Sequence, residues 1–203
     1  MQEIATERLI LRRMREEDLA AFVAYRRDPE VARYQTWDTD FSMADAEELL
    51  AGADGVKLAN KDGEWVNLAV VDRFDGTVHG DCAARVLANQ RATAEVGVTF
   101  ATASQGLGLA TEALTALVDT LFAEHRMHRV IAETDDRNPR VHRLLERLGF
   151  RCEGRLVEAD WCTGEWVTLR LFAVLAREWA TPAARPPRTG SLRRSRSPRS
   201  PRP

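Results

Sequence analysis

The sequence predicts a mixed α/β fold, in which a mostly antiparallel sheet of six to seven strands is flanked by about four helices. Two β-like runs, residues 65–71 and 77–87, are joined across Asp75-Gly76, which is a hairpin signal. Leu109, Ala113, Leu117 and Leu121 recur at helical spacing. Strand and helix patterns alternate in the order βααβββαβαββ, which indicates one layered α/β (α+β) domain.

Three elements precede the hairpin. RLILRR at residues 8–13 alternates apolar and charged residues and predicts a short strand. Asp18 is expected to cap a helix that runs through LAAFVAYRR and ends near Asp28-Pro29. A second helix fits residues 43–50, because Gly52 follows directly as a stop signal.

The remaining elements follow the hairpin. EVGVTFA, residues 95–101, completes a three-stranded meander, and the long amphipathic helix comes next. A strand at residues 129–134 and a helix at 138–148, ending at Gly149, follow. Strands at residues 151–159 and 166–175 complete the domain.

Charge divides the chain into two parts. The net charge is −2, but residues 181–203 hold seven arginines and no acid. The other 22 basic residues face 31 acids, so residues 1–180 carry −9. We expect residues 1–180 to fold and the Arg/Pro/Ser-rich tail to be disordered. The tail has no aromatic residue to stack on bases, so a solvated appendage is favoured over a nucleic-acid-binding arm.

Several classes of protein are disfavoured by composition. No run of about 18 apolar residues exists, and the charged start cannot be a secretory signal. Cys82, Cys152 and Cys162 show no C-x-x-C spacing, which favours a reducing cytoplasm over a zinc or disulfide scaffold. His125 and His128 lack a third ligand nearby, so no metal is expected.

The segment with the most chemical information is QGLGLATE, residues 105–112, which leaves a strand and opens the long helix. Free N–H groups at a helix start bind phosphate, and Gly106 and Gly108 allow close approach of the backbone. No lysine follows, which excludes a Walker-type loop. The dinucleotide fingerprint fits only partly, because Thr111 replaces its third glycine; the acids at 135–136 keep that alternative open.

The longer stretch AEVGVTFATASQGLGLATEAL resembles the acetyl-CoA-binding segment of the GNAT acetyltransferases. Gln105, Gly108 and Ala110 occupy the defining positions of the pattern Q/R-x-x-G-x-G/A. The branch that it most resembles is the Rim-like ribosomal-protein N-acetyltransferases. TERLILR, DPEVARY, NPRVHRLLERLGF, GEW and the ending AREW match this branch in order, over residues 6–179.

This resemblance implies a GNAT fold with acetyl-CoA as cosubstrate. The pyrophosphate would lie on the N–H groups of the glycine turn, and the pantetheine arm would run along the preceding strand, which splays from its neighbour. Asn138 matches an asparagine that touches the cofactor, and it also suits a helix N-cap before Pro139. The implied cofactor-binding residues are Val98, Phe100, Gln105, Gly106, Leu107, Gly108, Leu109, Ala110, Thr111 and Asn138.

The implied reaction is direct attack of a primary amine on the thioester in a ternary complex. A base must take the amine proton, and Glu95, acting through a water, is the first candidate. Its alternative role is a surface carboxylate paired with an arginine. Asp81 and His79 are weaker candidates. The backbone N–H of Val98 is the expected oxyanion donor.

The sequence departs from the family where an acid would stand. Leu145 occupies a position often held by tyrosine, and Val141 occupies the serine position of the Rim-like branch. Neither side chain can donate a proton, so water or a group that the sequence does not identify must protonate the thiolate. Tyr34 and Trp37 are candidates for contact with the acceptor.

A protein N-terminus is the leading acceptor that the resemblance implies. The charge of −9 favours a cationic acceptor of any kind, so a small amine such as an aminoglycoside or an amino-acid-like metabolite is the alternative. The missing acid leaves open a non-catalytic CoA-binding sensor. No membrane partner is expected, and a homodimer stays an option.

Overall fold

A computed structural model describes residues 3–52, 58 and 63–179. Its eight strands form one sheet in the order β1-β2-β3-β4-β5-β6-β8-β7. Neighbouring strands are antiparallel except for the parallel pair β5–β6. The strands are β1 (Ile4–Ala5), β2 (Leu9–Arg13), β3 (Val66–Asp72), β4 (Val78–Val86), β5 (Thr93–Phe100), β6 (Arg129–Asp135), β7 (Arg151–Cys162) and β8 (Glu165–Leu175).

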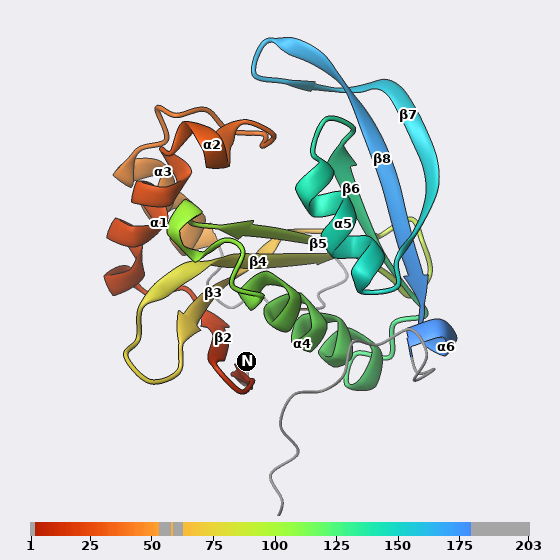
Figure 1. The fold of residues 1–203 in the computed structure, drawn as a ribbon, viewed down its shortest axis with the longest axis horizontal. Helices are drawn as coiled ribbons and strands as arrows, with labels where there is room; N and C mark the ends of the chain where they lie inside the picture. Colours follow the sequence, from red (N-terminus) through yellow and green to blue (C-terminus); the bar gives the residue numbers. More distant parts are fainter. Residues whose placement is uncertain (1–2, 53–57, 59–62, 180–203) are drawn as a thin grey trace, which may run out of the picture.

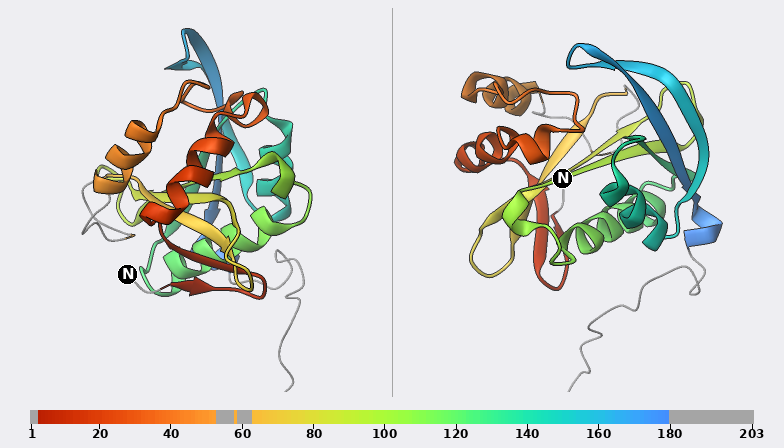
Figure 2. Two further views of the ribbon diagram at one scale, coloured as in Figure 1. Left: turned by 90° about the vertical axis from the view of Figure 1, so that its left-hand side faces the viewer. Right: turned by 45° about the horizontal axis from the view of Figure 1, so that its top comes forward.

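Helices cover both faces of the sheet (Figures 1 and 2). Cys82 packs in one core with residues of α4 and α5, whereas its neighbour Asp81 points to the opposite face and contacts α1. This alternation is the two-residue period of a strand covered on both sides. The helices are α1 (Leu19–Arg26), α2 (Pro29–Ala32), α3 (Met43–Gly52), α4 (Leu109–Ala123), α5 (Pro139–Arg147) and α6 (Ala176–Trp179), with single turns η1 (Glu16–Asp18) and η2 (Thr102–Ser104).

Two apolar cores hold these layers together. In the larger, Leu114, Leu117 and Leu121 of α4 are buried against the sheet, so the predicted apolar stripe is the buried face. In the smaller, Phe22 packs edge-on against Tyr25 and Phe41, with ring centroids 5.6 Å apart in both pairs. The smaller core joins α1, α2 and α3.

The predicted fold class is confirmed, with differences in detail. All seven expected strands are present, together with the two-residue β1, and α2 and α6 are additional short helices. The prediction for Asp18 is wrong. Its carboxylate makes no cap bond to α1 but binds the Arg12 guanidinium at 2.6 and 2.9 Å and accepts from the Arg15 N–H at 2.8 Å.

Two further expectations concern the tail and membrane spans. Residues 181–203 lie outside it, so the predicted tail stays a prediction. Within residues 3–52, 58 and 63–179, no helix combines the length and apolarity that a membrane span requires.

Candidate active site

An open groove of about 790 Å³ runs between α2, the end of β5, the glycine turn and α5. Three predicted site residues, Glu95, Leu107 and Trp37, do not line this groove among the described residues. The Leu107 side chain is 57% exposed to solvent. Most of the predicted cofactor residues line it, and so does one predicted acceptor residue. They are Val98, Phe100, Gln105, Gly106, Gly108, Leu109, Ala110, Thr111 and Asn138, with Tyr34.

The floor of the groove is a strand edge inside the sheet. β5 pairs with β6 only from Thr93 to Glu95, whereas it pairs with β4 as far as Phe100. The Ala101 N–H donates to the His79 carbonyl of β4, at 2.9 Å. Because backbone groups alternate between the two sides of a strand, those of Val98 and Phe100 face away from β4, where β6 has already diverged.

The glycine turn presents backbone N–H groups to the groove. Gly106 and Gly108 have left-handed φ angles of 77° and 79°, which L side chains rarely adopt. Gly108 is the N-cap of α4 and offers no capping side chain. The first N–H groups of α4 therefore have no partner within the helix and, together with the helix dipole, form an anion site.

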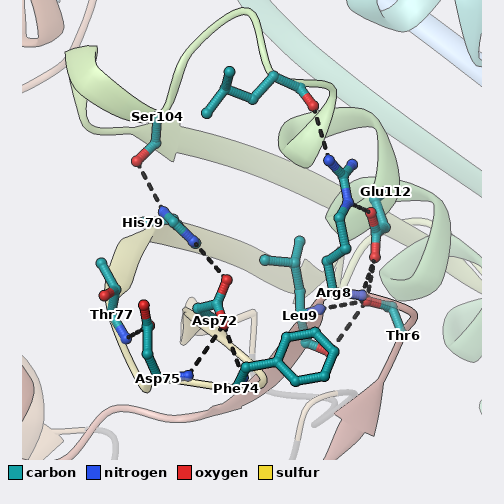
Figure 3. Close-up of polar contacts among 11 residues, drawn as sticks. Thr6, Arg8, Leu9, Asp72, Phe74, Asp75, Thr77, His79, Ser104 and Glu112 are labelled. Atoms are coloured by element: carbon teal, nitrogen blue, oxygen red, sulfur yellow. Dashed lines mark hydrogen bonds and ion pairs between the residues drawn. The ribbon is translucent and has the colours of Figure 1, made fainter.

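A polar brace holds this turn from behind (Figure 3). The Glu112 carboxylate accepts from the Thr6 hydroxyl at 2.6 Å, the Arg8 N–H at 2.8 Å and Arg8 Nε at 2.7 Å. Arg8 Nη1 also donates to the Leu107 carbonyl at 3.1 Å. We call Thr6, Arg8 and Glu112 the turn brace; it ties the first turn of α4 to the start of β2.

Gln105 and Asn138 make structural bonds at the groove. Gln105 donates through Nε2 to the Phe100 carbonyl at 3.0 Å and accepts from Arg140 Nη1 at 2.8 Å, so it bridges β5 and α5. Asn138 Oδ1 accepts from the Val141 N–H at 3.3 Å, as the predicted N-cap before a proline at N1. Both residues also line the groove.

One wall of the groove is basic, which sequence reasoning missed. Arg140, Arg143 and Arg147 of α5 line it, opposite Arg33, and Glu30 is the acid among the described lining residues. Spacings of three and four place the α5 arginines on one helical face. This i, i+3, i+7 spacing of arginines is the sequence signal that could have predicted a basic helical face. We call Arg140, Arg143 and Arg147 the arginine face.

Glu95 is buried, with 6% of its surface exposed. Its carboxylate accepts from Arg85 Nε at 2.8 Å and from Arg85 Nη2 at 2.6 Å. Burial raises the pKa of Glu95, Arg85 opposes that shift, and Glu133 adds to it, so the net pKa is raised. The arginine partner of the alternative interpretation is therefore present, although the Glu95 carboxylate itself is buried and the Arg85 side chain is 34% exposed.

Asp81 and Trp37 belong to a buried cluster around α1. The Tyr25 hydroxyl donates to Asp81 Oδ1 at 2.6 Å, and Arg26 Nη2 lies 3.7 Å from Asp81 Oδ2. Burial raises the pKa of Asp81 above its usual range. The Trp37 ring covers the Arg26 guanidinium at 3.7 Å, and its Nε1 donates to the Arg26 carbonyl. Trp37 is thus partly buried against the smaller core and does not line the groove.

His79 links the hairpin of β3 and β4 to η2 (Figure 3). Its Nδ1 lies 2.9 Å from Ser104 Oγ, and its Nε2 lies 3.6 Å from Asp72 Oδ2. Ser104 lines the groove, whereas the imidazole lies behind it. His79 is therefore placed to support η2, the segment that leads into the glycine turn.

The two positions without a proton donor lie beside the groove. Leu145 is 1% exposed in the larger core, and Val141 packs against that core while lining the groove. His125 and His128 follow α4, and the described residues include no group of three or more His, Cys, Asp or Glu side chains arranged to hold a metal.

Comparisons with known proteins give a consistent result. The family described as "Acetyltransferase (GNAT) domain" matches residues 8–151. The uncharacterized N-acetyltransferase p20 of Bacillus licheniformis is 27% identical over 180 residues, which cover 89% of this chain and 99% of that protein. A crystal structure of a GNAT-family acetyltransferase from Bacillus anthracis has a TM-score of 0.77 at 25% identity, covering 87% of this chain and all of that one.

A shorter match carries a named acceptor. The ribosomal protein uS5-alanine N-acetyltransferase of Escherichia coli is 36% identical over 75 residues, which cover 37% of this chain and 39% of that protein.

Proposed function

Because this chain belongs to the GNAT acetyltransferase family and is an acetyl-CoA-dependent N-acetyltransferase, we propose that residues 1–180 are its catalytic domain and that its acceptor is a protein amino terminus. The groove with its unpaired strand edge carries this proposal. The three cysteines of the chain are free thiols, which suits the cytoplasm that we propose as its location.

Acetyl-CoA supplies an activated acetyl thioester, and the groove residues fit such a molecule. Gly106 and Gly108 keep the backbone N–H groups of the turn open to a pyrophosphate, as their left-handed φ angles require. The backbone groups of Val98 and the Phe100 N–H can pair with the amides of an extended arm, whereas the Phe100 carbonyl already accepts from Gln105. The arginine face offers guanidinium groups to the remaining phosphate.

Glu95 is the proposed base. A raised pKa brings a carboxylate closer to the pH at which proton acceptance is efficient, and Arg85 fixes its orientation. The amine nitrogen bonds to the acetyl carbon, the carbon–sulfur bond breaks, and the amine proton passes through a water to Glu95. The Val98 N–H faces the charge that develops on the carbonyl oxygen. Water protonates the thiolate, because Val141 and Leu145 cannot.

Three observations support a protein acceptor. The relative that is 36% identical over part of its length is named for alanine acetylation on a ribosomal protein. The groove is open, and Tyr34 stands in its wall beside α2. Residues 1–180 carry −9, which attracts a basic protein. A small cationic amine is attracted by the same charge, so the named relative is the observation that favours a protein.

The test is acetyl transfer from acetyl-CoA to matched peptides. We expect thiol release with a peptide that has a free α-amine and none with the same peptide blocked at its N-terminus; mass spectrometry would locate the acetyl group. Faster turnover of polyamines or aminoglycosides than of every peptide would overturn the protein acceptor. CoA binding without turnover of any amine would indicate a sensor.

Glu95→Gln tests the base, with Glu133→Gln as the matched control carboxylate. Only the first should remove the acidic limb of the pH profile of kcat/KM, because the amide cannot accept the proton. Glu133→Gln should keep that limb and move it to lower pH, because Glu133 raises the pKa of Glu95. An unchanged pH profile in Glu95→Gln would exclude Glu95 from the mechanism.

A further inference from the structure

The tip of the β7–β8 hairpin exposes two tryptophans that the reaction described above does not use. Trp161 and Trp166 are 57% and 59% exposed and pack edge-on, with ring centroids 5.3 Å apart. Val157 beside them is 65% exposed. Large aromatic surfaces left open to water are costly and mark contact sites for other molecules.

Local geometry turns these side chains outward. Thr163 and Gly164 have φ angles of 49° and 87°, which form a tight two-residue turn between the strands. The register shifts between Leu156 and Asp160, so extra residues of β7 bulge out there, and Glu158 has a left-handed φ of 49°. Bulges redirect side chains, and pairing resumes beyond this one from Asp160 to Cys162, so the tip is a paired ribbon that carries the exposed side chains.

The tip is also acidic. Residues 156–166 contain Glu158, Asp160 and Glu165 but no basic residue. Arg137 binds Glu165 at 2.8 Å, whereas no arginine among the described residues pairs with Glu158 or Asp160. We call Val157, Glu158, Asp160, Trp161, Glu165 and Trp166 the hairpin-tip patch.

The patch is fixed to the mouth of the groove. Arg137 joins Glu165 to the loop directly before Asn138, and Asn138 lines the groove. Asp136 in the same loop binds Arg155 of β7 and Arg170 of β8. Figures 1 and 2 show the tip projecting beyond the rest of the domain, on the same side as α2, which lines the groove opposite α5.

We propose that the hairpin-tip patch binds a basic, extended segment of the acceptor protein, located a few residues after the amino terminus that is acetylated. This inference rests on the proposed function. Arginine side chains stack on tryptophan rings and pair with carboxylates, so one short Arg-rich segment satisfies both features of the patch. Two patches facing each other would place like charges together, which disfavours a second copy as the occupant.

Steady-state kinetics with two peptides test this. Both begin with the same free residues; one carries three arginines at positions 4–8, and the other carries three glutamines there. We expect the wild type to show a KM for the basic peptide about tenfold lower, because exposed cation–π and ion-pair contacts each contribute a modest amount. Raising the salt from about 20 to about 200 mM should shrink that difference.

Trp161→Ala/Trp166→Ala and Glu158→Gln/Asp160→Asn should each raise KM for the basic peptide about three- to tenfold, with kcat and the glutamine-peptide KM within about twofold. Phe74→Ala, which removes an aromatic ring that is 82% exposed on the β3–β4 turn, is the matched control and should change neither KM. Melting temperatures and CoA affinity would show that each variant is folded.

Three results would overturn the proposal. One is an equal KM for both peptides in the wild type, and another is an unchanged basic-peptide KM in both patch variants. The third is a change of molecular mass by light scattering in those variants, which would assign the patch to a second copy. If the wild type acetylates neither peptide, the proposed function itself fails and takes this inference with it.

Discussion

Removing the Glu112 carboxylate should both destabilise the fold and weaken CoA binding, because one side chain fixes α4, β2 and the glycine turn together. The carboxylate accepts three hydrogen bonds, at 2.6, 2.8 and 2.7 Å, and its side chain is 18% exposed. Arg8 is 44% exposed, so water compensates part of the loss. We expect Glu112→Ala to cost about 2 kcal/mol in the free energy of unfolding, which lowers Tm by about 4–8 °C in a chain of this length.

The effect on the cosubstrate follows from the bond between Arg8 and the Leu107 carbonyl. Without Glu112, Arg8 is less well oriented, and binding must order the turn. An ordering cost of about 1 kcal/mol corresponds to CoA binding about fivefold weaker. Thermal unfolding and titration calorimetry measure the two effects. Glu124→Gln is the control, because this exposed carboxylate lies at the other end of α4.

The stabilisation that Glu112 provides should depend on pH in a defined direction. Burial alone would raise the pKa of Glu112, but the bonds from Thr6 and Arg8 outweigh burial, and the pKa is lowered. A lowered folded-state pKa stabilises the protein above the unfolded-state pKa, about 4.3, and this contribution is lost as the pH falls through the folded-state pKa. The difference between wild type and Glu112→Gln should be constant near neutrality and shrink in acid. An unchanged Tm at pH 7, or a difference that grows in acid, would refute the reasoning.

Three further changes probe other parts of the molecule. Gly106→Ala has open space for a methyl group but a φ of 77°, so a backbone cost of about 1–2 kcal/mol should weaken CoA binding about tenfold; an unchanged Kd would contradict a preformed turn. Asp18→Asn leaves the buried Arg12 with only the exposed carboxylate of Glu17, at 3.9 Å, and should cost about 3 kcal/mol in urea unfolding; a loss below 1 kcal/mol would show that the pair is not limiting. Arg143→Glu should weaken CoA binding more at low than at high salt, unlike the exposed control Arg91→Glu; equal losses would remove Arg143 from the phosphate site.

Elements with strong local signals were predictable from the sequence. Gly76 has the positive φ, 76°, that the hairpin at Asp75-Gly76 requires, and Asn138 caps α5 as its position before proline indicates. The stripe of α4 is buried because its period matches one face of a helix. In each case the information lies within a few neighbouring residues.

Short elements were not predictable. β1 has two residues and α2 has four, so neither repeats a pattern long enough to recognise. Asp18 carried a real capping signal, but a buried arginine six positions earlier in the chain competed for the carboxylate and bound it. Local propensity gave way there to a tertiary contact.

In the candidate site, too, local features were predictable from the sequence and contacts between distant residues were not. The glycine turn and the unpaired edge at Val98 follow from a contiguous motif, whereas the turn brace joins residues 104 and 106 positions apart. The partner of Glu95 could not be named either. Arg85 becomes its neighbour only through the register of β4 with β5.

The early divergence of β5 and β6 also bears on aggregation. Open strand edges recruit other chains, and proteins protect the outer edges of their sheets for that reason. This chain has an open edge in the middle of its sheet, between β5 and β6, flanked by α5 and the glycine turn. The edge therefore lies on the floor of a groove and not on the outer rim of the sheet. The same geometry that leaves backbone groups available for binding thereby hides them from neighbouring proteins.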